Sequence, residues 1–262
     1  MSKARTERAK SVRRGLVALR SFAGLAVIWY VGALWIGNPV LMPTPLATAR
    51  ALIALGRSGD LLSNVEASVV RLLIALMLAV FLAVPLGILL GLSGRARRLI
   101  DPTIELIRPI SGIAWIPIGL FLFGVGNTLP VFIMIIAAFF PLLFNTAAGV
   151  QGVDRRLIAV ARTMGLTRAT IVRRVVLPAA TPDILVGFRL AVAYAWTAIV
   201  AAELIGAPSG VGFAIEWYRE LLMSAKVFSF IAVIGGVGLV SDLLVRGLQR
   251  RLAPWAAATG LP

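Results

Sequence analysis

Four ionisable residues lie within stretches that are otherwise apolar enough for a lipid bilayer: Arg71, Arg108, Arg189 and Glu203. Because charged groups are costly inside a membrane, each of them is a candidate for a functional role. Arg71 lies at one end of its stretch, where its side chain can reach the lipid headgroups. Arg189 can pair with Asp183 only if the backbone between them bends. The sequence therefore favours a structural role for these two arginines.

Arg108 stands in a different setting, the segment IRPISGIAWIP. Prolines and a glycine interrupt the helix there, and an arginine beside irregular backbone attracts anions. With Ser111 and Trp115, Arg108 is a candidate contact for an anionic solute on a translocation pathway. The alternative is a structural ion pair of Arg108 with Glu105 or Glu203. An unpaired Glu203 would repel an anion, so pairing or a gating role is the better expectation for that carboxylate.

The residue types that are absent disfavour most enzymatic chemistry. The chain of 262 residues contains no cysteine and no histidine, so it offers no thiolate and no imidazole as a metal ligand or proton shuttle. The net charge is +15, but the chain is 60% hydrophobic with a mean hydropathy of +0.95. Its basic residues fall between the apolar runs, which is typical of an integral membrane protein and not of a nucleic-acid-binding domain.

A helix of about 20 apolar residues crosses the hydrocarbon core of a membrane. The sequence predicts an all-α bundle of six such helices in a single domain, 1–262. Prolines and a glycine predict that the third helix is bent or partly unwound, and a short amphipathic helix is expected at 48–55. The six predicted spans are 17–36, 68–92, 104–124, 128–150, 184–206 and 227–245.

The distribution of basic residues predicts the orientation. A basic leader, 1–16, opens the chain, and nineteen Lys and Arg fall in the leader to Arg20, in 93–103, in 151–178 and in the C-terminal tail. The alternate segments, 37–67 and 207–226, hold only four. Positively charged loops stay in the cytoplasm. Both termini and the segment 151–178 are therefore expected there.

The segment 151–178 reads as two short helices joined at Gly165, which would end the first helix in a left-handed conformation. The first helix places Leu157, Ala161 and Met164 on one side. The second begins at Thr167 as N-cap, places Ile171 and Val175 on one face, and ends before Pro178. Two uses fit this basic helix–turn–helix: a surface that lies on anionic headgroups, or a docking surface for a soluble partner.

Two short motifs in this segment, AVARTMG from Ala159 and VVLP ending at Pro178, resemble the cytoplasmic loop of ABC importer permeases. The loop pattern of that family begins with a glutamate, which is Ala159 here. The segments LIDPTIELIRPISGIAWIPIGLFLFGVGNT and ILVGFRLAVAYAWTAIVAAELIGAPSGVGF are similar to permeases of the nitrate, sulfonate and taurine importers. The resemblance implies a coupling loop for an ATP-hydrolysing subunit, formed by Leu157, Ala159, Ala161, Arg162, Met164, Gly165, Arg168, Ile171, Leu177 and Pro178.

The resemblance also implies the assembly. The chain would form half of a homodimeric pore in a bacterial inner membrane, with two ATP-binding subunits and an extracytoplasmic solute-binding protein. It would bind no cofactor directly, because the phosphate-binding pattern G-x-x-x-x-G-K-[ST] is absent and ATP would be used by the partner. The expected solute is a small anion of the nitrate, sulfonate or taurine class. The alternatives are an ion-coupled secondary transporter or channel subunit, and a membrane-embedded enzyme.

Overall fold

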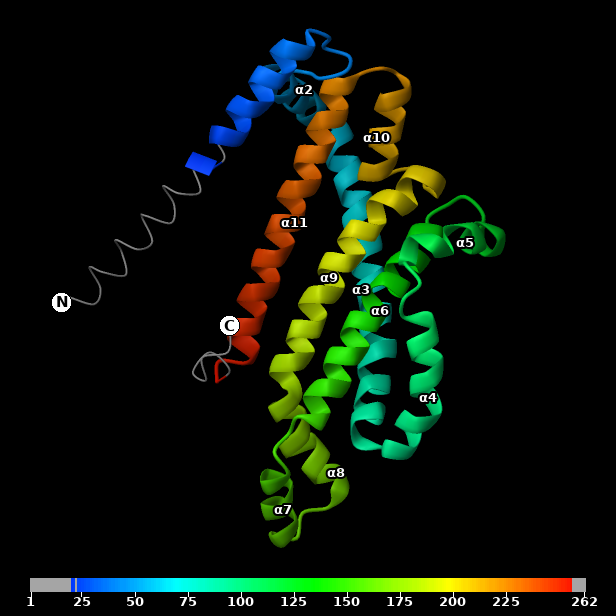
Figure 1. The fold of residues 1–262 in the computed structure, drawn as a ribbon, viewed down its shortest axis with the longest axis vertical. Helices are drawn as coiled ribbons and strands as arrows, with labels where there is room; N and C mark the ends of the chain where they lie inside the picture. Colours follow the sequence, from blue (N-terminus) through cyan, green and yellow to red (C-terminus); the bar gives the residue numbers. More distant parts are fainter. Residues whose placement is uncertain (1–19, 22, 256–262) are drawn as a thin grey trace, which may run out of the picture. The chain divides into compact units, whose positions relative to one another are not determined.

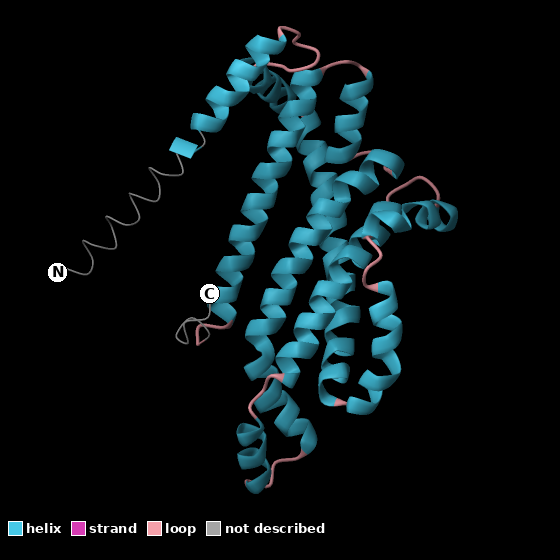
Figure 2. Cartoon of the chain, viewed as in Figure 1, coloured by secondary structure: helices cyan, strands magenta, loops and turns pink. Residues whose placement is uncertain are grey.

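The computed structural model describes residues 20, 21 and 23–255. Every regular element in this part of the chain is helical, which confirms the all-α prediction (Figures 1 and 2). The predicted leader, 1–16, lies outside the described residues. The helices are Ala23–Ile36, α2 (Pro45–Ser58), α3 (Asp60–Leu92), α4 (Gly94–Ile107), α5 (Ile116–Phe123), α6 (Thr128–Gln151), α7 (Arg155–Thr163), α8 (Arg168–Ile171), α9 (Leu177–Gly206), α10 (Val211–Glu220) and α11 (Ser224–Leu252).

The helices form two compact units. Of the described residues, the larger unit comprises Ser63–Ala214 and those from Val233 onward, and the smaller comprises those up to Leu62 together with Ile215–Ala232. Helices α3, α10 and α11 therefore contribute residues to both.

Small residues fill the centre of the larger unit, where α3, α6 and α9 pack together. A Cβ atom on Gly87 of α3 would lie 2.7 Å from the Cβ atom of Thr146 on α6, so the two helices approach too closely for a larger side chain. Such residues allow close packing in a membrane, where interhelical contacts replace the hydrophobic effect. The alanines of this core with no exposed surface are Ala75, Ala79, Ala83, Ala138, Ala191 and Ala195.

The smaller unit is held by contacts of its aromatic and hydroxyl side chains. Trp29 donates a hydrogen bond from Nε1 to the Pro43 carbonyl at 3.0 Å and stacks on Phe228. Helix α2 contains the predicted segment 48–55 but begins earlier, because the Thr44 side chain caps it and Pro45 suits its first turn.

The number of membrane spans differs from the prediction. Four described helices are long and apolar enough to cross a membrane: α3, α6, the continuous helix Arg168–Gly206 and α11. The pair α4 and α5 supplies a fifth if its two bent parts count as one span. The described part of the predicted span 17–36 includes the apolar helix Ala23–Ile36, which is shorter than a full span. Six spans are therefore not confirmed.

The third predicted span is broken, as its sequence indicates. Helix α4 ends at Ile107, and the chain resumes with a 3₁₀ turn, Gly112–Trp115, followed by α5. The two parts are bent by 85°. The break falls at Pro109, which has no backbone N–H to donate to a carbonyl of the preceding turn, so the helical hydrogen bonding stops after Arg108. Pro117, by contrast, sits in the first turn of α5, where a proline is tolerated.

The turn between the two short helices of the segment 151–178 matches the prediction. Gly165 has a φ of +76°, and its N–H donates to the Arg162 carbonyl at 3.0 Å. The Leu166 N–H donates to the Ala161 carbonyl at 3.2 Å, so the pair forms the hydrogen-bond pattern of a Schellman motif. Thr167 then caps α8 through its side chain, which accepts from the Thr170 N–H.

The second helix of this segment does not end before Pro178, and that prediction is wrong. A π-helical turn, Val172–Val176, joins α8 to α9, and the Leu177 N–H donates to the Val172 carbonyl five residues back. Pro178 follows at once, in the first turn of α9, where its missing N–H is tolerated. The wider turn lets one helix run from Arg168 to Gly206.

Candidate functional site

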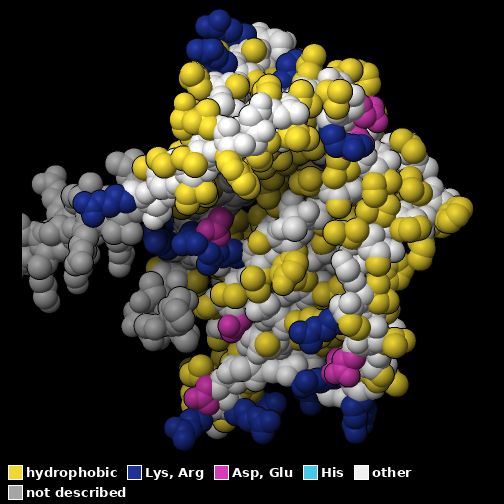
Figure 3. Space-filling model, turned by 45° about the horizontal axis from the view of Figure 1, so that its top comes forward, with side chains coloured by type: hydrophobic (Ala, Val, Ile, Leu, Met, Phe, Trp, Pro, Cys, Tyr) yellow, Lys and Arg dark blue, Asp and Glu magenta, His cyan; other side chains and the backbone are white. Residues whose placement is uncertain are grey.

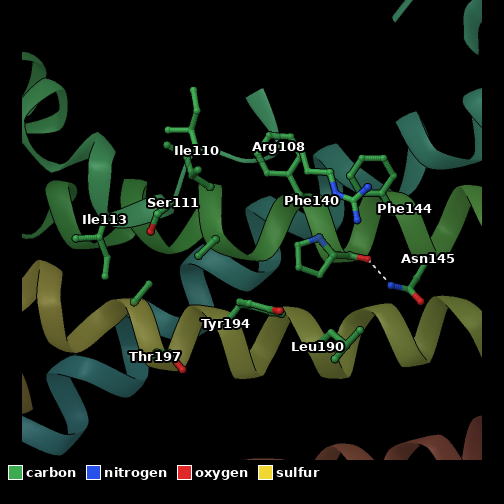
Figure 4. Close-up of a pocket in the computed structure, with 15 residues that line it drawn as sticks. Arg108, Ile110, Ser111, Ile113, Phe140, Phe144, Asn145, Leu190, Tyr194 and Thr197 are labelled. Carbon is green, nitrogen blue, oxygen red and sulfur yellow. Dashed lines mark hydrogen bonds between the residues drawn. The ribbon is translucent and has the colours of Figure 1, made fainter. Parts of the chain in front are cut away.

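A cavity of about 420 Å³ lies beside the break between α4 and α5. Three segments form its walls: the break itself, the middle of α6 and the middle of α9 (Figure 4). Its lining includes two of the candidate pathway residues, Arg108 and Ser111. Both side chains belong to the break, between the end of α4 and the 3₁₀ turn that follows it.

Arg108 is held by an aromatic ring. Its guanidinium carbon lies 4.5 Å from the centroid of the Phe144 ring on α6, which is a cation–π contact. The Arg108 N–H donates to the Ile104 carbonyl at 2.8 Å, so the residue continues the last turn of α4. Among the described residues, neither Glu105 nor Glu203 forms an ion pair with Arg108. Arg108 therefore presents an exposed positive charge at the cavity.

The polar lining of the cavity comes partly from residues that the sequence did not single out: Asn145, Tyr194 and Thr197. Figure 4 shows Asn145 beside Phe144 on α6, and Tyr194 and Thr197 on the facing helix. The Asn145 amide nitrogen donates to the Pro141 carbonyl at 2.7 Å, and Thr197 donates to the Ala193 carbonyl at 3.0 Å. The available signal was the presence of these polar side chains in apolar spans, Tyr194 and Thr197 lying three residues apart on one helix face.

The other two candidate pathway residues lie elsewhere. Trp115 packs in an apolar cluster with Ile116 and Leu129 and does not line the cavity. Glu203 is fully buried and accepts a hydrogen bond from Arg71 Nη1 at 2.6 Å. Arg71 is itself only 4% exposed, so the predicted extension of its side chain to the headgroups is wrong. The pairing that the sequence suggested for Glu203 is present, but with an arginine 132 residues away in the chain.

The Arg71–Glu203 pair is satisfied on every side. Arg71 makes five hydrogen bonds, to Glu203, to the Asn127 side chain through Nε and Nη2, and to the carbonyl and hydroxyl of Ser209. Glu203 also accepts from the Ser68 hydroxyl at 2.8 Å and from the Gly212 N–H at 3.0 Å. These bonds join α3, the start of α6, the end of α9 and the start of α10. A buried ion pair needs such additional partners to offset its desolvation.

Arg189 also pairs with a different residue than expected. Its Nε donates to Asp242 of α11 at 2.6 Å, rather than to Asp183 on its own helix. Asp242 is 53 residues away in the sequence, and only tertiary packing brings it beside Arg189.

The segment 155–164 divides into an inner and an outer face. Ala161 is buried in a cluster with Ile171 and Val176, whereas Leu157, Val160 and Met164 are exposed. The sequence placed Leu157, Ala161 and Met164 on one side; the structure shows that Ala161 packs inward. Arginine side chains gather around this end of the larger unit, at the bottom of the view in Figure 3. An exposed apolar face among arginines suits contact with another protein.

Three comparisons with known proteins bear on this arrangement. A family model described as "Binding-protein-dependent transport system inner membrane component" matches residues 83–254. The taurine transport system permease protein TauC of Escherichia coli is 37% identical over 236 residues, covering 88% of this chain and 86% of that protein. A putative aliphatic sulfonates transport permease protein of Bacillus subtilis is 35% identical, with 89% and 85% covered.

Two further matches are more distant. The bicarbonate transport system permease protein CmpB of Synechococcus elongatus is 33% identical over 246 residues, covering 90% of this chain and 88% of that protein. Among solved structures, a chain of the MetNI methionine ABC transporter, in an inward-facing conformation, matches with a TM-score of 0.67 and 16% identity. That match covers 75% of this chain and 98% of the other, and it concerns the fold.

Proposed function

The chain belongs to the family of binding-protein-dependent transport system inner membrane components, and on this basis we propose that it passes a small anionic solute through the Arg108 cavity. It is a membrane-spanning permease subunit of an ABC importer. The observation that carries the proposal is the exposed Arg108 guanidinium, seated on Phe144 and surrounded by hydroxyl and amide side chains. Such a cavity attracts a negative group and leaves apolar and aromatic surface for the rest of the solute.

The relatives support an anionic headgroup. The named solutes of three of them are taurine, aliphatic sulfonates and bicarbonate. Each carries a compact group whose single negative charge is shared by two or three oxygen atoms, and the planar guanidinium can donate to two such oxygens at once. We propose a sulfonate or a similar small anion for this chain. Arg108 would hold the headgroup, while Ser111, Asn145 and Thr197 would supply neutral polar contacts around it.

The energy would come from a separate ATP-hydrolysing subunit, in two copies, that contacts the segment 155–178. The exposed Leu157, Val160 and Met164 support this docking role over a purely headgroup-binding one, because apolar side chains on a basic loop gain most from burial against protein. A second copy of this chain would complete the pore, and an extracytoplasmic binding protein would deliver the solute. Both termini and this segment would lie in the cytoplasm of a bacterium, with the bundle in its inner membrane.

The cavity is tested by transport in reconstituted membranes that contain the permease, its ATPase subunit and its binding protein. Replacing Arg108 with Gln should abolish most uptake of a small sulfonate, and replacing it with Lys should retain more than Gln does. The control is Arg98→Gln on α4, which removes the same charge from an exposed arginine whose Nε donates to the Gly94 carbonyl of its own helix. Wild-type uptake in Arg108→Gln would exclude the cavity as the solute contact. Uptake that follows an ion gradient without ATP would instead favour a secondary transporter.

The coupling segment is tested at Gly165. A β-branched residue is strained at a φ of +76°, by roughly 1 kcal/mol or more. Gly165→Val should therefore insert in the membrane normally, yet capture less ATPase subunit and show weaker solute-stimulated ATP hydrolysis. Gly59 offers a matched control: its φ is +84°, and like Gly165 it has open space around it. Equal ATPase coupling in Gly165→Val and Gly59→Val would contradict a coupling role for the segment.

A further inference from the structure

A second charge cluster of the larger unit lies between α9 and α11. Arg189 Nε contacts one oxygen of Asp242 at 2.6 Å, and Arg246 Nε contacts the other at 2.8 Å. One carboxylate between two guanidinium groups leaves an excess of one positive charge. The side chains of Arg189, Asp242 and Arg246 are 39%, 30% and 50% exposed. This cluster therefore faces an accessible surface, unlike the buried Arg71–Glu203 pair.

The two arginines keep unused hydrogen-bond donors. Within the described part of the chain, both contact Asp242 through Nε, and their terminal amino groups have no partner. A guanidinium group presents five N–H donors in a planar fork that matches the oxygens of a phosphate or carboxylate. The carboxylate thus fixes the two forks in place while their outer donors remain available to an anion.

A cavity of about 230 Å³ adjoins the cluster, lined by Arg189 and Asp242 with Thr197, Trp196, Gly238 and Ser241. Trp196 donates from Nε1 to the Ile234 carbonyl at 3.0 Å, which fixes the indole across the cavity. The liquid volume of one water is about 30 Å³, so the space suits a single tetrahedral anionic group and a few waters. It shares only Thr197 with the Arg108 cavity.

The residues around the cluster are apolar and exposed, which suits a bound lipid better than a water-soluble anion. Exposed leucine and valine side chains lie on α11 beside it, and only 11% of the most apolar stretch of this helix is buried. Arg246 lies six residues before the end of α11, or about 9 Å along the axis, and Arg250 and Arg251 follow in its last turn. Four of the exposed apolar residues of α11 lie just before Arg246: Leu239, Val240, Leu243 and Leu244.

We propose that the Arg189–Asp242–Arg246 cluster binds the phosphate of an anionic phospholipid from the cytoplasmic leaflet. The phosphate oxygens accept from the free amino groups of the two arginines, and the acyl chains lie along the exposed apolar residues of α11. Basic pockets between membrane helices on the cytoplasmic side recognise lipid headgroups in this way. A soluble anion would gain the same charge contacts but no apolar ones.

The test measures lipid retained by the transporter purified from membranes as its complete complex. Native mass spectrometry compares added phosphatidylglycerol with zwitterionic phosphatidylethanolamine. Wild type should retain phosphatidylglycerol preferentially, and Arg246→Gln should retain about fivefold less of it. The control Arg98→Gln removes one cytoplasmic charge outside the cluster and should retain as much as wild type. Equal retention of the two lipids by wild type, as expected if a second copy of the chain covers this face, would overturn the proposal.

A second variant separates lipid binding from a structural role of the ion pair. Asp242→Asn removes the carboxylate and raises the cluster from one excess positive charge to two. Retention of phosphatidylglycerol should therefore rise. The increase in unfolding temperature that this lipid gives the complex should also be larger than in the wild type. Unchanged retention in both Asp242→Asn and Arg246→Gln would show that the cluster only pairs helices. Inorganic phosphate and methanesulfonate serve as free-anion probes. Displacement of the lipid by either at millimolar concentration would assign the site to a soluble anion and overturn the proposal.

Discussion

Arg71 and Arg108 both lie in apolar stretches of the larger unit, but they differ in burial and in the use of their N–H donors. Arg71 is buried, and its five N–H donors are all used within the protein. Arg108 is exposed at a cavity and rests on one aromatic ring. The hydrogen bonds of the Arg71–Glu203 pair join four helices. The guanidinium of Arg108 is instead available to another molecule. For these two arginines, the availability of the N–H donors, and not the apolar surroundings, separates the structural role from the candidate binding role.

The largest expected effect follows from breaking the Arg71–Glu203 pair. Glu203→Gln or Arg71→Gln leaves one buried charge without its partner, which costs about 3–5 kcal/mol of stability. Thermal unfolding of the purified complex measures this loss. The double variant should lose less than the sum of the two single losses, because no unpaired charge remains. Additive losses would show that the pair does not act as one unit.

Arg108 should give the reverse pattern, a loss of transport with little loss of stability. A hydrogen bond to a charged group contributes about 1.5–3 kcal/mol, so Arg108→Gln should raise the KM for a sulfonate about tenfold or more. The unfolding temperature of this variant should stay close to that of the wild type, since the substitution leaves no buried charge unpaired. A clear drop in unfolding temperature, with unchanged KM, would place Arg108 in the same class as Arg71.

The smallest effect is expected from the ring beneath Arg108. Phe144→Leu removes a cation–π contact worth about 0.5–1 kcal/mol at an exposed site while keeping an apolar side chain. The KM should rise only a few-fold, and Phe144→Leu should have almost no further effect once Arg108 is Gln, because the ring then has no cation to hold. Independent effects of the two substitutions would mean that the ring does not act through Arg108.

Much of the fold follows from local properties of the sequence. The apolar lengths predict α3, α6, α9 and α11, the prolines and glycine around Pro109 predict the break, and Gly165 predicts its own left-handed turn. The start of α3 and the continuation of α9 through Pro178 were missed. A π-helical turn precedes Pro178 and leads directly into α9, and propensity rules that treat proline as a helix stop do not anticipate it.

The partners of the charged residues could not be predicted in the same way. Arg71 with Glu203, and Arg189 with Asp242, are pairs separated by 132 and 53 residues, and only the packing of helices decides which charges meet. The sequence favoured headgroup contact for Arg71 because the residue lies near the end of an apolar run. It selected Arg108 and Ser111 from the local backbone break, but Asn145, Tyr194 and Thr197 join them only through the packing of α6 and α9.

The π-helical turn at Val172–Val176 has a mechanical consequence. Because α8 continues into α9 without a break, Arg168 and Thr197 belong to one rod, about 44 Å apart along its axis. A lateral displacement of α8 would therefore be transmitted along α9. It would act on Thr197 in the wall of the Arg108 cavity and on Glu203, which is held by Arg71. The π turn, followed by Pro178 and Pro182, interrupts the regular hydrogen bonding of the rod, and such interruptions are where helices bend. If α8 moves with the ATPase subunit as proposed, the stiffness of residues 172–176 determines how much of that displacement reaches the Arg108 cavity.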